Sequence, residues 1–301
     1  MKKSTRKTVG RVALTLFLLL LLSLSAAAVS AQPAAKTSAT PLKRQAKAPT
    51  STTRDVPARV TETQVDSSIP SDPGVEKMLV PYSPKVRELE VVVGKLVGEL
   101  KKSGMGSGSL GNFVADGMRT QAGFRLGQPI DLAVMNSGGL RRNVIGEGEL
   151  RARDIFELLP FENALVTLEL TGEQVMKLLA VVVSGREAQS GAVITYIIKA
   201  DKSAELESAK LLDKDGHERE IDPRATYRVV TIDYLINVGG ARYAILREGK
   251  NARPLGITLR DAIIAYVKSE TAARRDIQPN LDDRFVLDRI KSVLSWEAPP
   301  Q

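Results

Sequence analysis

The segment Leu159–Val183 (LPFENALVTLELTGEQVMKLLAVVV) contains the change of hydrophobic period that decides the fold class. Its residues Ala164–Leu170 alternate between apolar and polar side chains, which is the two-residue period of a half-buried strand. Thr171 then predicts the start of a helix over Gly172–Val183, because a threonine hydroxyl caps the free amides of a first helical turn. The sequence therefore predicts a strand that leads directly into a helix.

The flanking sequence adds helices and strands in an irregular order. We predict strands at Glu88–Leu100, Ile130–Met135, Ala192–Ile198 and Tyr227–Asp233, a hairpin of Ala209–Leu212 with Glu218–Ile221, and helices from Asp72-Pro73 to about Pro81 or Pro84, at Leu110–Gln121, Arg153–Leu159 and Leu259–Lys268. Because these elements do not alternate as regular βαβ units, the sequence predicts one α+β domain with a mixed sheet, over residues 76–301.

The first 75 residues differ in composition from the rest. Residues 1–31 resemble a secretory signal peptide, with a basic start, an apolar run over Val12–Leu24 and the small-x-small pattern Val29-Ser30-Ala31. We expect cleavage after Ala31 and export to a periplasmic or extracellular location. The alternative is an uncleaved membrane anchor, since Val12–Val29 approaches the length of a spanning helix. Residues 32–75, rich in Ala, Pro, Ser and Thr, predict a disordered linker.

Charge and residue counts exclude several function classes. The 301 residues carry a net charge of +8, but residues 1–80 hold 12 basic and 5 acidic residues, whereas residues 81–301 hold 31 and 30. The near-neutral domain gives no reason to expect nucleic-acid binding. With no cysteine and one histidine, His217, the chain cannot form a thiolate metal site or a dimetal hydrolase centre rich in imidazoles. We expect no cofactor, no metal site and no catalytic residue, and His217 in a solvated turn.

Four motifs combine tight turns with aromatic or polar side chains. Asn136-Ser137-Gly138-Gly139-Leu140-Arg141 follows a buried strand, so that its glycines allow a ligand to approach the backbone and Arg141 offers a planar fork of donors. Taken alone, this stretch is better explained as an ordinary glycine turn with a solvated arginine. Phe161 follows a helix-ending proline, where it is either a core side chain or a ring that stacks on a flat ligand. The other two motifs are Leu110-Gly111-Asn112 with Asp116, and Tyr234 followed by Gly239-Gly240 and Tyr243.

In this order and spacing, the motifs resemble the C-terminal domain of the 5′-nucleotidase family. The family pattern is LGN-x-x-x-DA, N-G-G-G-[IL]-R, LPF-x-N-x-L with LTG, and F-L-A-x-GGDGY, and the resemblance covers about residues 76–290. It implies a nucleoside pocket in which two aromatic rings enclose the base. The family's N-terminal dimetal phosphoesterase motifs are missing from this sequence.

The resemblance implies four substrate-binding residues: Asn136, Arg141, Phe161 and Tyr234. The fourth motif departs from the family, because one extra residue separates Tyr234 from the glycines. Without a gap in the alignment, Leu235 takes the position of the ring. Ala241 stands where the family has a ribose-binding aspartate, and Ser103–Ser109 lacks a family arginine.

The sequence therefore predicts an exported nucleoside- or nucleotide-binding domain of a hydrolase family, inactive alone and serving a separate metallophosphoesterase chain. The alternatives are a structural or adhesion domain whose nucleoside pocket has decayed and, least favoured, an independent enzyme. We expect membrane contact only if the leader stays uncleaved.

Overall fold

The computed structural model describes residues 62, 64–213 and 215–297. The predicted signal peptide at 1–31 and most of the predicted linker at 32–75 lie outside the described residues. From Ser67 on, the chain forms one compact unit. In the part of the chain described here, we find no helix that is both long and apolar enough to cross a membrane.

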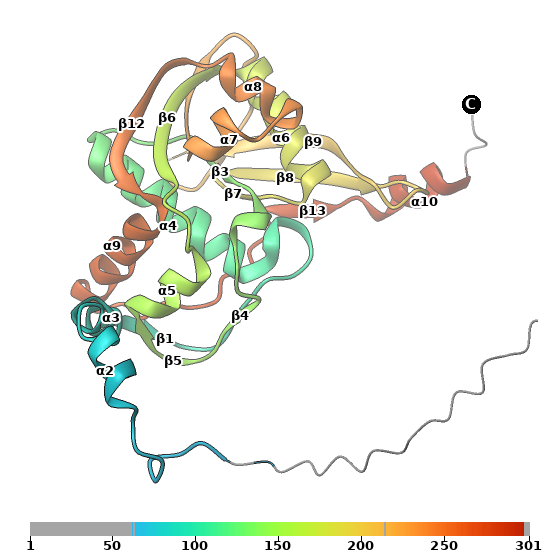
Figure 1. Ribbon diagram of the computed structural model, residues 1–301. Coiled ribbons are helices and arrows are strands. Elements are labelled where there is room, and N and C mark those ends of the chain that lie inside the picture. Colours follow the sequence, from blue (N-terminus) through green and yellow to red (C-terminus); the bar gives the residue numbers. More distant parts are fainter. Residues whose placement is uncertain (1–61, 63, 214, 298–301) are drawn as a thin grey trace, which may run out of the picture. The chain divides into compact units, whose positions relative to one another are not determined.

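A mixed five-stranded sheet lies at the centre of this unit (Figure 1). Its strand order is β12 (Lys250–Thr258), β6 (Ala164–Thr171), β11 (Thr226–Ile232), β3 (Leu132–Met135) and β7 (Ala188–Ser190). β11 pairs parallel with β3 and antiparallel with β6. The predicted α+β class with a mixed sheet is confirmed, and the alternating segment at 164–170 is the central strand β6.

Three long helices pack on the strands and on one another. α4 (Gly108–Leu126) contacts both α9 (Leu259–Ala272) and β7, and α6 (Gly172–Gly185) packs on β6. α6 begins as predicted, because the Thr171 hydroxyl accepts a hydrogen bond from the Gln174 amide, whose side chain in turn accepts one from Thr171 N. Leucine and valine side chains from these helices and from the sheet form one continuous core.

A second, four-stranded sheet extends to the right of the first in Figure 1. Its order is β10 (Glu218–Arg219), β9 (Ala204–Leu212), β8 (Ala192–Ile198) and β13 (Phe285–Leu287). α6 covers β9 and α10 (Arg289–Glu297) contacts β8. The predicted hairpin is confirmed, because Glu218 pairs with Leu212.

Two short antiparallel pairs and several short helices complete the unit. β1 (Val92–Leu96) pairs with β5 (Gly148–Arg151), and β2 (Leu100–Lys101) pairs with β4 (Val144–Ile145). The short helices are α5 (Ala152–Leu158), α7 (Asp233–Asn237) and α8 (Ala244–Arg247), with 3-10 turns at Met105–Ser107, Ser137–Gly139 and Ala241–Tyr243.

The strand predicted at Glu88–Leu100 is wrong at its start. Pro84 in the first turn favours a helix start, and the helix that follows, α3 (Ser83–Leu89), includes the first residues of the predicted strand. β1 therefore begins only at Val92. Gly98, with a φ of +89°, then turns the chain before β2. The helix predicted from Pro73 is α2 (Pro73–Leu79), capped by Asp72 Oδ1.

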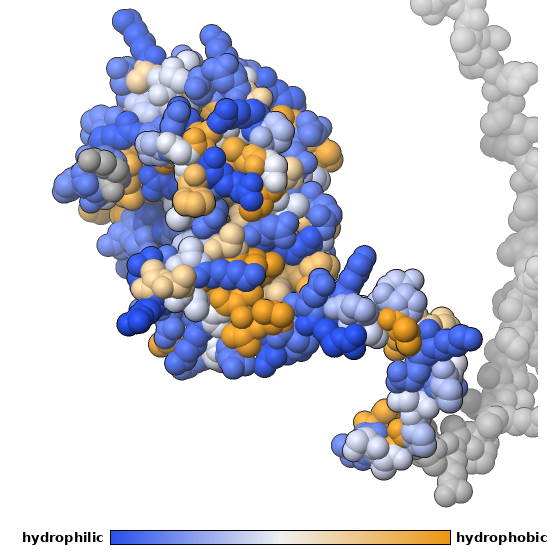
Figure 2. All heavy atoms as spheres, turned by 90° about the vertical axis from the view of Figure 1, so that its left-hand side faces the viewer, coloured by the Kyte–Doolittle hydropathy of each residue, from blue (hydrophilic) through white to orange (hydrophobic). Residues whose placement is uncertain are grey.

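α2 and α3 bury none of their side chains. Figure 2 views the molecule from the side on which α3, α5 and α9 lie in Figure 1, and apolar surface is gathered in the lower half of this face. Because α2 and α3 contribute no buried side chain, the hydrophobic core begins with β1, where Val93 and Leu96 are buried.

Candidate functional site

The structure brings the four predicted site residues to one pocket of about 340 Å³. Asn136, Arg141, Phe161 and Tyr234 line it together with Gly138, Gly139 and Asn163. Three elements explain this convergence. β3 and β11 run parallel and end before Asn136 and Tyr234, while β6 runs antiparallel to β11 and begins after Phe161. All three therefore deliver their loops to the same edge of the sheet.

Asn136 carries an unpaired polar atom at this pocket. Its Oδ1 is buried and accepts no hydrogen bond from the described residues. Gly138 and Gly139 curve around the side chain, since a Cβ on Gly139 would lie 3.3 Å from Oδ1. A buried acceptor without a donor costs about 1–3 kcal/mol. Because Asn136 lines the pocket, a rotation of its side chain would bring Oδ1 within reach of a ligand N–H or O–H group, which would recover this energy.

Glu187 fixes the turn that presents Asn136. Its buried carboxylate accepts a hydrogen bond from Ser137 N at 2.6 Å and another from the Tyr243 hydroxyl at 2.6 Å. The Ser137 hydroxyl donates to Arg186 O and accepts from the Ser107 hydroxyl. Burial, and then the hydrogen bond to Glu187, raise the pKa of Tyr243. Sequence reasoning missed Glu187, because no motif includes it.

Arg141 and Phe161 lie against each other at the pocket. The Arg141 guanidinium carbon is 5.7 Å from the centre of the Phe161 ring, a cation–π distance. The Arg141 amide also donates to Leu158 O at 2.9 Å, which ties the glycine turn to the end of α5. Phe161 is 48% exposed. Its ring is therefore available to a ligand, and Phe161 is not a core phenylalanine.

Tyr234 lines the pocket despite the extra residue that follows it. The Tyr234 carbonyl accepts hydrogen bonds from Val238 N at 2.8 Å and from Gly239 N at 2.9 Å. The second bond spans five residues, so the end of α7 widens and absorbs the insertion. Tyr234 is 43% exposed, whereas Leu235 is fully buried. The structure thus places Tyr234, and not Leu235, at the pocket.

Asn163 also lines the pocket, although the motifs did not predict it as a site residue. It lines the cavity between Phe161 and the start of β6, and its carbonyl accepts a hydrogen bond from Leu259 N at 2.8 Å. Ala241, in contrast, lies exposed in the turn after Gly240 and is not among the residues that line the pocket. Its position two residues after Phe161 and directly before the strand would have been enough to predict Asn163 as a pocket residue.

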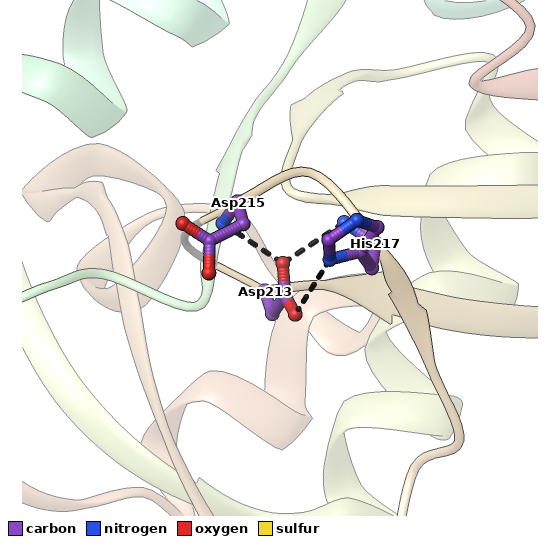
Figure 3. Close-up of side chains that lie close together, drawn as sticks. All are labelled: Asp213, Asp215 and His217. Atoms are coloured by element: carbon purple, nitrogen blue, oxygen red, sulfur yellow. Dashed lines mark hydrogen bonds and ion pairs between the residues drawn. The ribbon is translucent and has the colours of Figure 1, made fainter.

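His217 lies in a solvated turn, as predicted. Figure 3 shows it beside Asp213 and Asp215. The atoms of these three side chains that could coordinate a metal ion lie within 4.8 Å of one another. Asp213 Oδ1 accepts hydrogen bonds from the backbone amides of Asp215 and His217. These bonds close a turn, and the turn accounts for the proximity of the three side chains. The same bonds also lower the pKa of Asp213, with the His217 amide as the largest cause. His217 is 81% exposed, so this cluster is a surface feature.

The fold and the pocket define an α+β domain that presents a small-molecule cavity at a sheet edge. Residues 91–248, which are more than half of the chain, match the family described as 5′-nucleotidase, C-terminal domain. The chain belongs to this family. The predicted resemblance is thereby confirmed.

Several relatives support the assignment and show how much of them this chain covers. It is 30% identical to the trifunctional nucleotide phosphoesterase protein YfkN of Bacillus subtilis over 155 residues, 49% of this chain and 10% of that protein. It is 29% identical to protein UshA of Yersinia enterocolitica over 171 residues, 55% of this chain and 29% of UshA. The structure of a 5′-nucleotidase precursor from Thermus thermophilus superposes with a TM-score of 0.60 at 25% identity, covering 73% of this chain and 44% of that one. The chain thus spans less than half the length of these relatives.

Proposed function

We propose that this protein is an exported nucleoside- or nucleotide-binding domain in nucleotide catabolism, which supplies substrate recognition to a separate metallophosphoesterase chain. One observation carries the proposal. Two half-exposed aromatic rings, Phe161 and Tyr234, reach one pocket from different loops, next to the unpaired Oδ1 of Asn136. Membership of the 5′-nucleotidase C-terminal domain family is consistent with a nucleotide-derived ligand.

The chemistry of the pocket suits a nucleobase with an attached sugar. Flat aromatic rings stack favourably on a heterocycle, and such stacking contributes about 1–3 kcal/mol per base. Asn136 and Asn163 offer amide groups to the edge of a base, and Arg141 offers donors to a hydroxyl or phosphate oxygen. In this proposal, Phe161 and Tyr234 hold the base, while Asn136 and Arg141 select its polar groups.

The proposed partner follows from the histidine count. Dimetal phosphoesterase centres hold their ions with several imidazoles and carboxylates, and this sequence has one histidine, which lies in a surface turn. We therefore propose that the chain is inactive alone and that another chain supplies the metal site. The basic and apolar pattern of residues 1–31 supports export with cleavage after Ala31.

Two features of the sequence favour a second candidate, a structural or adhesion domain with a decayed pocket. The methyl group of Ala241 cannot accept a hydrogen bond from a ribose hydroxyl, and no arginine lies in the 103–109 loop. Loss of two such contacts weakens binding by about 1–3 kcal/mol each.

Calorimetric titration of the full chain with adenosine and with AMP tests the proposal. We expect binding that Phe161→Ala weakens, while Phe124→Ala leaves it unchanged. Phe124 is a matched control, because it is 83% exposed on α4 and does not line this pocket. If the wild-type chain binds neither ligand at millimolar concentration, the decayed-pocket alternative is correct.

A further inference from the structure

Arg260 occupies an unfavourable position for a cation. It is the second residue of α9 and only 9% exposed. The N-terminal end of a helix carries a partial positive charge, which disfavours a cation in the first turn. Burial adds a desolvation cost that a cation must recover from close partners.

The partners of Arg260 belong to one short segment. Its guanidinium carbon lies 4.5 Å from the centre of the Phe156 ring. One terminal nitrogen donates to Pro160 O at 3.4 Å, and the other donates to the Glu162 carboxylate. Pro160 and Glu162 are the two neighbours of Phe161, so the guanidinium fork spans the residue whose ring reaches the pocket.

The adjacent backbone strengthens this attachment. Leu259 N donates to Asn163 O at 2.8 Å, so two consecutive residues of α9 hold the turn that contains Phe161. The Phe161 ring is half-exposed, so the core encloses it on one side only. The orientation of the exposed side of the ring then depends in part on how firmly its backbone is held.

We propose that Arg260 is a positioning residue, which holds Phe161 in the orientation that forms one wall of the pocket. This inference rests on the proposed function, since Phe161 is taken as the ring that contacts the base. Arg260 is not among the pocket-lining residues, so its effect on a ligand passes through the 160–162 turn.

A double-mutant cycle on affinity tests the proposal. The variants are Arg260→Gln, Phe161→Ala and the two combined, titrated with adenosine and with AMP in the full chain. We expect Arg260→Gln to weaken binding several-fold when Phe161 is present, and to have no further effect when Phe161 is alanine. A purely structural role predicts the opposite pattern, an equal loss in both backgrounds, and that result would overturn the proposal.

Two further variants separate positioning from general loss of stability. Arg275→Gln is the matched control, because Arg275 forms a bidentate pair with Glu270 near the other end of the same helix, outside the pocket. It should leave affinity unchanged. Glu162→Ala removes the exposed acceptor and keeps Arg260 in place, so it tests the same attachment if Arg260→Gln does not fold. It should also weaken binding only when Phe161 is present.

A measurement without ligand keeps this inference separate from the proposed function. The chain has six phenylalanines, so fluorophenylalanine labelling gives a simple ¹⁹F NMR spectrum in which Phe161→Leu identifies the Phe161 signal. We expect Arg260→Gln to shift that signal toward its unfolded position and Arg275→Gln to leave it in place. If the wild type binds no nucleoside, the proposed function fails, and an unmoved Phe161 signal in Arg260→Gln would overturn the positioning role independently.

Discussion

Asp233 Oδ1 accepts a hydrogen bond from the backbone amide of Ala164 at 3.0 Å, although the two residues are 69 positions apart. The same oxygen accepts from Tyr234 N at 2.8 Å. Ala164 begins the strand that follows the Phe161 loop, and Tyr234 carries the second ring. One carboxylate oxygen therefore ties together the two loops that bring aromatic rings to the pocket.

Replacing Asp233 by alanine should loosen both loops. We expect Asp233→Ala to weaken nucleoside binding and to lower the free energy of unfolding by about 1–2 kcal/mol, because two backbone donors lose their acceptor. Asp233→Asn keeps a carbonyl oxygen at this position and should restore most of both. Paired calorimetry and denaturant unfolding measure the two effects. Equal losses in the alanine and asparagine variants would contradict the bridging role.

Phe161→Ala should lower affinity and leave the fold intact. Loss of a stacking ring costs about 1–3 kcal/mol, so the dissociation constant for adenosine should rise about tenfold or more. Truncation of a buried phenylalanine costs about 3–5 kcal/mol of stability, but the Phe161 ring is half-exposed and should cost far less. Thermal unfolding and titration of the same variant decide between the two roles. A strongly destabilised variant would show that Phe161 acts as a core residue.

The sequence predicts the pocket better than it predicts what supports the pocket. Asn136, Arg141, Phe161 and Tyr234 are selected by motif order, and the structure gathers them around one cavity. Their supports have no local signal, because each acts across the fold. Ser137 and Glu187 are 50 residues apart, and Arg260 and Glu162 are 98 apart.

The fold shows the same division between local and distant causes. β6 follows from its alternating pattern, and α6 follows from the Thr171 cap. β12 has no such local signal, because it is an edge strand with a largely exposed surface and no hydrophobic period. Its pairing with β6, interrupted by register shifts, depends on the rest of the sheet.

Gly239 should be intolerant of a side chain, because it closes the widened turn after Tyr234. A Cβ there would lie 2.5 Å from Leu235 O and 2.7 Å from the Tyr243 ring. We expect Gly239→Ala to lower the free energy of unfolding by about 1–3 kcal/mol, as overpacking does, and to weaken binding through Tyr234. Gly146→Ala is the control, since a Cβ at Gly146 would meet no atom within 4 Å. Similar stability of the two variants in urea unfolding would contradict the steric argument.

The purified chain should show no metal-stimulated phosphatase activity. One histidine in a surface turn cannot supply the imidazole ligands of a dimetal centre. The measurement is phosphate release from AMP with added manganese or zinc, before and after a further purification step. His217→Ala serves as the control for residual signal. Robust hydrolysis that survives purification and disappears in His217→Ala would overturn the proposal that this chain only binds.

Asn136 should show opposite effects on stability and on binding. Its buried Oδ1 has no donor among the described residues, so the folded protein bears a desolvation cost at this atom. Asn136→Leu removes the unpaired oxygen at similar volume, and we expect the free energy of unfolding to stay equal or to rise by about 1 kcal/mol. Nucleoside affinity should fall at the same time, because the base loses its acceptor. Ser137 is an unsuitable site for the same exchange, since its hydroxyl already bonds to Arg186 and Ser107 and its loss should destabilise the turn. Thermal unfolding with and without adenosine measures both quantities on one sample. A destabilised Asn136→Leu protein with unchanged affinity would show that Oδ1 supports the fold and does not serve a ligand.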